Sequence, residues 1–187
     1  PTRRDENWRY ANLRALDTVR SFLPVPKRTV VTALPPALPG FSRLVFIDGR
    51  LCPEHTLPDV ALLASLQHAP AHSADPAAAL FEAAGDGRLG LLARMFAPEP
   101  LALHVTGRLA LQLVSITTAE AGGNYLEIAL QLAAQAQLEL VEQHVGSAGP
   151  AGLTCMQLGI QVAEQAQLTH TRLQCSAPDA LHYDTSR

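Results

Sequence analysis

An eight-residue segment occurs twice in the second half of the chain, thirty positions apart. Residues 131–138 read QLAAQAQL and residues 161–168 read QVAEQAQL, so six of the eight positions are identical. Self-similarity at a fixed period of about 20–50 residues is typical of architectures that stack one structural unit on the next. We expect a fainter copy upstream, in which Leu103, Val105, Leu109 and Leu111 align in turn with Leu130, Leu132, Ala136 and Leu138.

Within each copy the apolar residues fall at every second position, which is the spacing of β-strands rather than of helices. Turn-forming residues separate the copies, at positions 117–124 and 146–154. One coil of two or three short strands cannot bury its own apolar face, whereas coils stacked about 4.8 Å apart pair with one another and enclose a core. The repeat therefore predicts an all-β-dominated fold with three coils of a β-solenoid. A two-sheet antiparallel sandwich is the alternative that remains open.

Stacking predicts which side chains of successive coils lie side by side. We expect one inward column to contain Leu111, Leu138 and Leu168. Ladders of amide side chains are expected to pair Gln131 with Gln161, Gln135 with Gln165, and Gln137 with Gln167. By the same alternation, His170 is expected in a column with Leu113 and Leu140. His104 is matched by Gln131 and His144 by Gln174, so these two histidines are expected to belong to polar ladders.

Charge and hydropathy exclude two classes of partner. The chain has 14 Lys and Arg residues against 17 Asp and Glu residues, a formal net charge of −3. It has no extended basic cluster to neutralise phosphates, so nucleic acid is not an expected partner. No apolar run reaches the roughly 18–20 residues of a membrane span, and no signal-peptide pattern opens the chain. Three scattered cysteines do not form a disulfide framework, which favours a reducing, cytoplasmic compartment.

The first half of the chain predicts a small α+β region. Residues 5–23 have the pattern of an amphipathic helix, and Trp8 is expected either to dock this helix on the first coil or to bind a partner. Residues 33–39 form a proline-rich linker. A β-hairpin is expected over residues 44–52, with Asp48 and Gly49 in a type I′ turn. Residues 60–66 fit either a strand or a helix, and residues 77–84 and 89–96 are expected to be helical. We place a boundary after this region, dividing the chain into residues 1–97 and 98–187.

No group of side chains in the sequence has the spacing of a self-contained active site. His170, Cys175 and His182 offer nitrogen and sulfur ligands, but their separations match no tight metal-ligand pair. Cys155 lacks an identifiable base. Glu139 and Glu142 are expected on opposite faces of one strand, and the glycines at 85, 87, 122 and 123 lack the context of a phosphate-binding loop. We therefore assign no catalytic residue and no metal ligand, and leave cofactor-binding residues open.

Several segments together resemble SufD, in the SufB/SufD family of iron–sulfur cluster assembly proteins. They are PTRRDENWRYANL at residues 1–13, the hairpin at 44–52, LELVEQHVG at 138–146, LTHTRLQ at 168–174 and APDALH at 177–182. The resemblance implies an N-terminal helical region followed by a right-handed parallel β-helix and a C-terminal helical segment. It also implies assembly with a SufB-like protein through the β-helix and with a SufC-like ATPase through the C-terminal part.

The resemblance implies that the chain is a non-enzymatic scaffold subunit. It also implies that the chain is part of a longer protein, because it has about half of the usual length of a family member. Any iron–sulfur cluster, and flavin if it binds, then belongs to the assembled complex rather than to this chain. A second copy pairing through an open strand edge is a further expected partner. Two alternative functions remain open: a metal-binding β-solenoid module built on His170, Cys175 and His182, and a carbohydrate-active enzyme on a β-helix.

Overall fold

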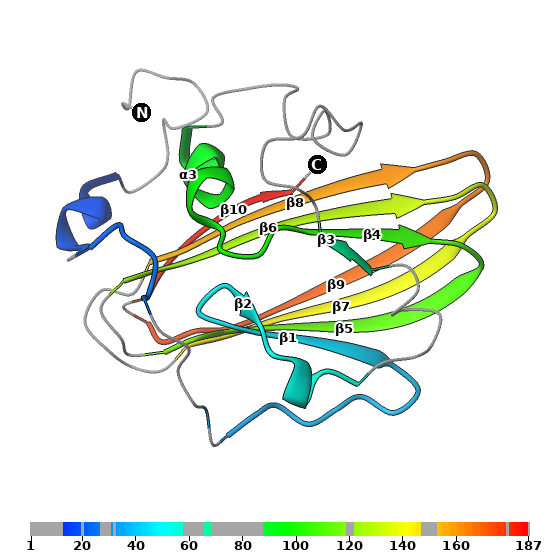
Figure 1. The fold of residues 1–187 in the computed structure, drawn as a ribbon, viewed down its shortest axis with the longest axis horizontal. Helices are drawn as coiled ribbons and strands as arrows, with labels where there is room; N and C mark the ends of the chain where they lie inside the picture. The colour runs from blue at the N-terminus through cyan, green and yellow to red at the C-terminus, as the bar shows by residue number, and fades with distance from the viewer. Residues whose placement is uncertain are drawn as a thin grey trace.

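The protein is built mainly from strands in two five-stranded sheets (Figure 1). The computed structural model describes residues 13–19, 21–26, 31, 33–57, 66–68, 88–118, 122–146, 153–178 and 180–186. Sheet A has the strand order β10 (Leu181–Ser186), β8 (Leu153–Val162), β6 (Gly123–Leu132), β4 (Leu101–Val105) and β3 (Leu66–His68). Sheet B has the order β2 (Arg50–Leu51), β1 (Ser42–Ile47), β5 (Arg108–Thr117), β7 (Gln137–Gly146) and β9 (Gln167–Cys175).

From β4 onward the chain alternates between the two sheets, and each strand pairs in parallel with the strand two places later. The repeated segment spans the corners between β6 and β7 and between β8 and β9. Leu138 lies directly beside Leu168 in parallel strands, as the repeat predicted. The antiparallel sandwich is therefore wrong for these strands.

The glutamine pairs that the repeat predicted are neighbours in the structure. Gln131 pairs in register with Gln161 in sheet A, and Gln137 pairs with Gln167 in sheet B. At the corner between them, Gln135 Nε2 donates to Gln165 Oε1 at 3.4 Å. Both corner glutamines have a positive φ, 64° and 57°, so the two corners share one backbone conformation.

The alignment of the upstream copy is correct in sheet A but wrong in sheet B. Leu103 and Val105 pair with Leu130 and Leu132, as expected. Leu109, however, pairs with Leu138, and Leu111 pairs with Leu140. The reason is the corner between β4 and β5, which contains residues 106–107, whereas the next two corners contain residues 133–136 and 163–166.

This shorter corner changes two of the expected columns. The column with Leu138 and Leu168 begins at Leu109 rather than Leu111. His170 does lie beside Leu140, but the next residue in that column is Leu111 rather than Leu113.

The main core lies between the two sheets. Its members are the apolar side chains that point inward from both sheets, among them Leu103, Leu111, Leu130, Leu140 and Leu158.

The outer faces of the two sheets are covered as well. Helix α3 (Arg88–Phe96), which confirms the helix expected at 89–96, packs on the outer face of sheet A, where Phe96 lies against Tyr125 with ring centroids 5.3 Å apart. The proline-rich segment lies over the outer face of sheet B, and Gln112 bonds to the backbone of Pro36 and Leu38.

The hairpin expected near residue 48 is confirmed. β1 and β2 pair in an antiparallel manner, and both turn residues have positive φ angles, 49° at Asp48 and 81° at Gly49. The Asp48 carboxylate accepts hydrogen bonds from the backbone and hydroxyl of Thr118, at 2.9 and 2.8 Å. β1 also pairs in parallel with β5, so this hairpin belongs to sheet B. The boundary between residues 97 and 98 stays a prediction.

The prediction of a long N-terminal helix at residues 5–23 is wrong for the residues in this range that the structure describes. Only Leu13–Thr18 is helical, and it is a 3-10 helix. The physical reason lies further along the chain. Gly123 N donates to Leu23 O at 2.8 Å and Val25 N donates to Gly123 O at 3.4 Å, so residues 23–25 are held extended against the start of β6. Trp8, residues 60–65 and residues 77–84 lie outside the described residues, while Leu66 begins a strand.

Within the described part of the chain, each helix is too short or too polar to cross a membrane.

The three cysteines differ in exposure, which predicts a selective reaction. Cys52 and Cys155 are buried and Cys175 is exposed. Burial raises the pKa of the Cys155 thiol to about 12. Because the thiolate is the reactive form, we expect iodoacetamide to alkylate Cys175 in the folded protein at least about a hundredfold faster than Cys155. Peptide mass spectrometry over a time course measures this ratio. All three should react in guanidinium chloride, and equal rates in the folded protein would contradict the burial of Cys155.

Candidate functional site

The interior between the sheets changes from apolar to polar along β7 and β9. The inward positions of β7 begin with Leu138 and Leu140, which belong to the core, and continue with Glu142 and His144, which are equally buried. The residue beside Glu142 in β9 is Arg172. Strand β10 of the facing sheet presents His182, Asp184 and Ser186 at alternate positions, in register with the inward residues of β8. Three strands thus contribute to one polar cluster.

Glu142 is the centre of this cluster. Its side chain is 0% exposed, and each carboxylate oxygen has a basic partner. Oε1 pairs with His144 Nε2 in a short contact, while Oε2 lies 2.8 Å from His170 Nε2. Arg172 donates to Oε2 from Nε at 3.1 Å and from Nη2 at 3.0 Å. Burial by itself raises the pKa of Glu142, but the hydrogen bonds and charges of His144 and Arg172 outweigh it, so this pKa lies below its ordinary value.

Arg172 connects the two sheets. Its Nη2 atom donates to Ser186 Oγ at 2.7 Å and lies 2.9 Å from Asp184 Oδ2. Oδ2 has no hydrogen bond of good geometry among the described residues, so its contact with Arg172 is mainly electrostatic. Ser186 Oγ also donates to Asp184 Oδ1 at 2.7 Å. Burial raises the pKa of Asp184, yet its contacts with His182 and Ser186 and the charge of Arg172 lower it by more.

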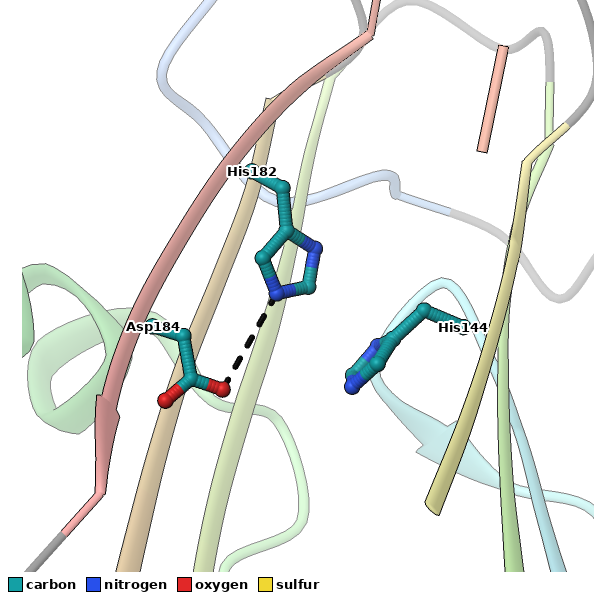
Figure 2. Close-up of side chains that lie close together, drawn as sticks. All are labelled: His144, His182 and Asp184. Atoms are coloured by element: carbon teal, nitrogen blue, oxygen red, sulfur yellow. Dashed lines mark ion pairs between the residues drawn. The ribbon is translucent and has the colours of Figure 1, made fainter. Parts of the chain in front are cut away.

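His144, His182 and Asp184 form a compact group (Figure 2), in which His144 is the residue that contacts Glu142. The two imidazole rings meet edge to face, with centroids 4.5 Å apart and an interplanar angle of 73°. His182 Nε2 lies 3.9 Å from Asp184 Oδ2, which is too long for a hydrogen bond. One potential ligand atom from each of the three residues lies within 4.8 Å of the others. Among the described residues, these three are the group whose geometry would admit a metal ion.

Buried polar atoms without a partner are concentrated in this group. Within the described structure, His144 Nδ1 and both ring nitrogens of His182 are buried and accept or donate no hydrogen bond. His144 is 2% exposed as a whole residue. Most buried polar atoms in proteins are paired with protein groups, ordered water or ions, so a concentration of exceptions at one place calls for a partner such as a water molecule or an ion.

The structure only partly agrees with the residues singled out from the sequence. His182 belongs to the group, and His170 contacts Glu142 but lies outside the group. Cys175 is exposed and is not a member. His104 is exposed beside Gln131, as expected for a ladder residue. His144 does lie beside Gln174, but it is a buried partner of Glu142 rather than a surface ladder residue.

Sequence reasoning missed Glu142, Arg172 and Asp184 as members of one cluster. Glu139 and Glu142 do face opposite ways, exposed and buried respectively. The signal that was available is the spacing of two residues in Glu142-x-His144, His170-x-Arg172 and His182-x-Asp184. In a strand, residues two apart face the same side, so each pair shares the inward face of its strand.

The fold and the cluster together define a strand-rich protein with two mainly parallel sheets and a carboxylate–imidazole–guanidinium network that is centred on the buried Glu142 and reaches the surface at Arg172. No protein-family model matches the chain, and no curated protein matches it.

Proposed function

We propose that the chain is a non-catalytic scaffold of an iron–sulfur cluster assembly complex, acting in the cytoplasm with SufB-like and SufC-like partners. The observation that supports this role is the parallel, in-register pairing of strands at the thirty-residue repeat. This is the layering that a β-solenoid requires, and the sequence segments that resemble SufD suggest the same architecture. In this proposal any cluster, and any flavin, belongs to the assembled complex.

The finer fold that we propose is a right-handed parallel β-helix. In such a fold each coil contributes one strand to each face, and every strand pairs with the equivalent strands of the coils before and after it. The series β4, β6, β8 and β10 in sheet A and the series β1, β5, β7 and β9 in sheet B fit this scheme.

The surface that we assign to the SufB-like partner is the side of the last described coil. β9 and β10 are the edge strands of the two sheets on this side, and a strand in this position presents backbone groups that a partner strand can pair with. Two apolar side chains are also exposed there, Val162 (47%) and Leu173 (43%). Paired β-helices that continue each other's sheets would cover both features.

Co-purification tests this role. An affinity-tagged chain is expected to retain a SufB-like protein, and with it a SufC-like ATPase, from cells that produce all three. We expect the double substitution Val162→Lys and Leu173→Lys to lower the recovered SufB-like protein at least about tenfold, because charged side chains would be buried on association.

Leu57→Lys is the matched control, because Leu57 is a similarly exposed apolar residue (49%) and is paired with Arg43 of β1, which β5 and β7 separate from the edge strand β9. It should leave recovery unchanged. Recovery of neither partner by the unmodified chain, or equal loss in the control and the double variant, would contradict the proposal.

A further inference from the structure

We propose that His144, His182 and Asp184 bind a first-row divalent transition-metal ion. The inference is independent of the scaffold role, because it rests on the interior cluster and not on the partner surface. Two imidazole nitrogens and one carboxylate oxygen form a donor set that suits zinc and iron(II), and it leaves at least one coordination position open.

The distances between the three potential ligand atoms are somewhat longer than those in a metal-bound site. The three potential ligand atoms lie within 4.8 Å of one another. Bonds of about 2.0–2.2 Å to a tetrahedral zinc ion place ligand atoms about 3.3 Å apart, so the donors must approach one another by about 1.5 Å at most. His182 and Asp184 lie on β10, a terminal strand, and their side chains are 16% and 13% exposed. Both side chains extend from β10 toward the side on which His144 lies, so the approach would be across the space between them (Figure 2).

The unpaired nitrogens are the second, independent observation. Imidazole is a strong hydrogen-bonding group, and leaving it buried without a partner has a free-energy cost because its hydrogen bonds to water are lost. His144 and His182, which are grouped with Asp184, together present three such nitrogens within the described structure. A cation that accepts a lone pair from each ring would remove part of this cost.

Glu142 and Arg172 form the surroundings that such a site needs. A carboxylate bonded to a ligand imidazole fixes the orientation of the ring and raises its basicity, and Glu142 contacts His144 in this way. Arg172 in turn holds Glu142. With neutral imidazoles, the carboxylates of Glu142 and Asp184 and the guanidinium of Arg172 sum to one negative charge, which favours a cation. Binding requires that Asp184 exchange its ion pair with Arg172 for the metal, while Arg172 remains bonded to Glu142.

Metal titration of the purified full chain tests the site. After removal of metal by a chelator, zinc is added in a calorimeter, and cobalt(II) is added while its visible absorption is recorded. We expect one ion per chain, and an intense cobalt spectrum typical of four ligands. His182→Gln and Asp184→Asn are each expected to weaken binding at least about tenfold. Both side chains are partly exposed, so these variants are expected to fold, which circular dichroism without metal verifies.

His104→Gln is the matched control, because His104 is an exposed histidine on β4 at a distance from the cluster in the strand order. It should bind zinc and cobalt as the unmodified chain does. A folded chain that takes up neither ion would overturn the proposal, and so would an equal loss of affinity in His104→Gln and His182→Gln. The titration needs no partner protein, so a failure of the metal site can be distinguished from a failure of the proposed scaffold role.

Discussion

The Glu142→Gln variant should lose about 3–5 kcal/mol of its free energy of unfolding, the range measured when one member of a buried ion pair is removed. The Glu142 side chain is fully buried and contacts His144, His170 and Arg172. Glutamine has nearly the same shape but carries no charge, and its NH₂ group would face a donor where a carboxylate oxygen now accepts. Arg172 would keep its contact with Asp184 but would lose a partner in the interior.

Urea denaturation at neutral pH, followed by circular dichroism, gives the two free energies. Glu139→Gln is the control, since Glu139 lies on the same strand and faces solvent. The control is expected to stay within about 0.5 kcal/mol of the unmodified protein. If Glu142→Gln behaved like Glu139→Gln, the cluster would not be a buried charge network. A double variant that replaces both Glu142 and Arg172 with apolar residues should lose less than the sum of the single losses, because the two residues bond directly to each other and each single variant already removes that interaction.

Truncation of Leu140 is the second change for which we expect a large loss of stability. Leu140 is fully buried in the main core and lies between Leu111 and His170 in the neighbouring strands. Replacing a buried leucine by alanine removes its apolar contacts and leaves a cavity, which costs about 2–5 kcal/mol. The upper part of this range is expected, because strands on both sides limit how far the cavity can collapse.

Leu173→Ala is the control that separates the effect of burial on stability from the effect of the leucine-to-alanine change itself. Leu173 is 43% exposed on the neighbouring strand β9, so Leu173→Ala should lower the free energy of unfolding by less than about 1 kcal/mol. Both variants are compared by urea denaturation with the same baseline treatment. Similar losses in the two would show that position 140 does not lie in a closely packed interior.

The repeat predicted strand neighbours correctly wherever the corner length was also repeated. The corner that contains Gln135 and the corner that contains Gln165 have the same length, so every pair from Gln137 to Val145 follows the thirty-residue offset. The upstream corner at Gly107 is two residues shorter. A shift by two leaves the alternation of inward and outward side chains intact, so the apolar pattern of the sequence contains no sign of it. A shift by one would have been visible.

Long-range backbone contacts explain the error in the N-terminal helix. The apolar periodicity of residues 5–23 is a local property, whereas the extended conformation at Leu23 and Val25 depends on Gly123, about a hundred residues away. Propensity is a weak guide where the backbone finds hydrogen-bond partners elsewhere in the fold.

The candidate site was missed because ligands were sought by separation along the chain. That criterion joined Cys175 to His170 and His182. The structure groups residues by inward position instead, and position 175 is outward and exposed. Which inward residues of sheet A face those of sheet B also depends on how the chain connects β7 to β8 and β9 to β10, which the repeat does not determine.

The layered arrangement of strands also implies an order of unfolding. Each inner strand is held by two neighbours, whereas β9 and β10 on one side of the sheets, and β2 and β3 on the other, are each held by one. In stacked architectures stability is approximately a sum of contacts between adjacent layers, so opening is easiest at a terminal layer. Among the strands from β4 to β10, the amide hydrogens of β10 and β9 should therefore exchange with solvent earliest, and those of β5, β6 and β7 last. A metal ion or a partner protein on the terminal layer would slow exchange there first, without any change in the central strands.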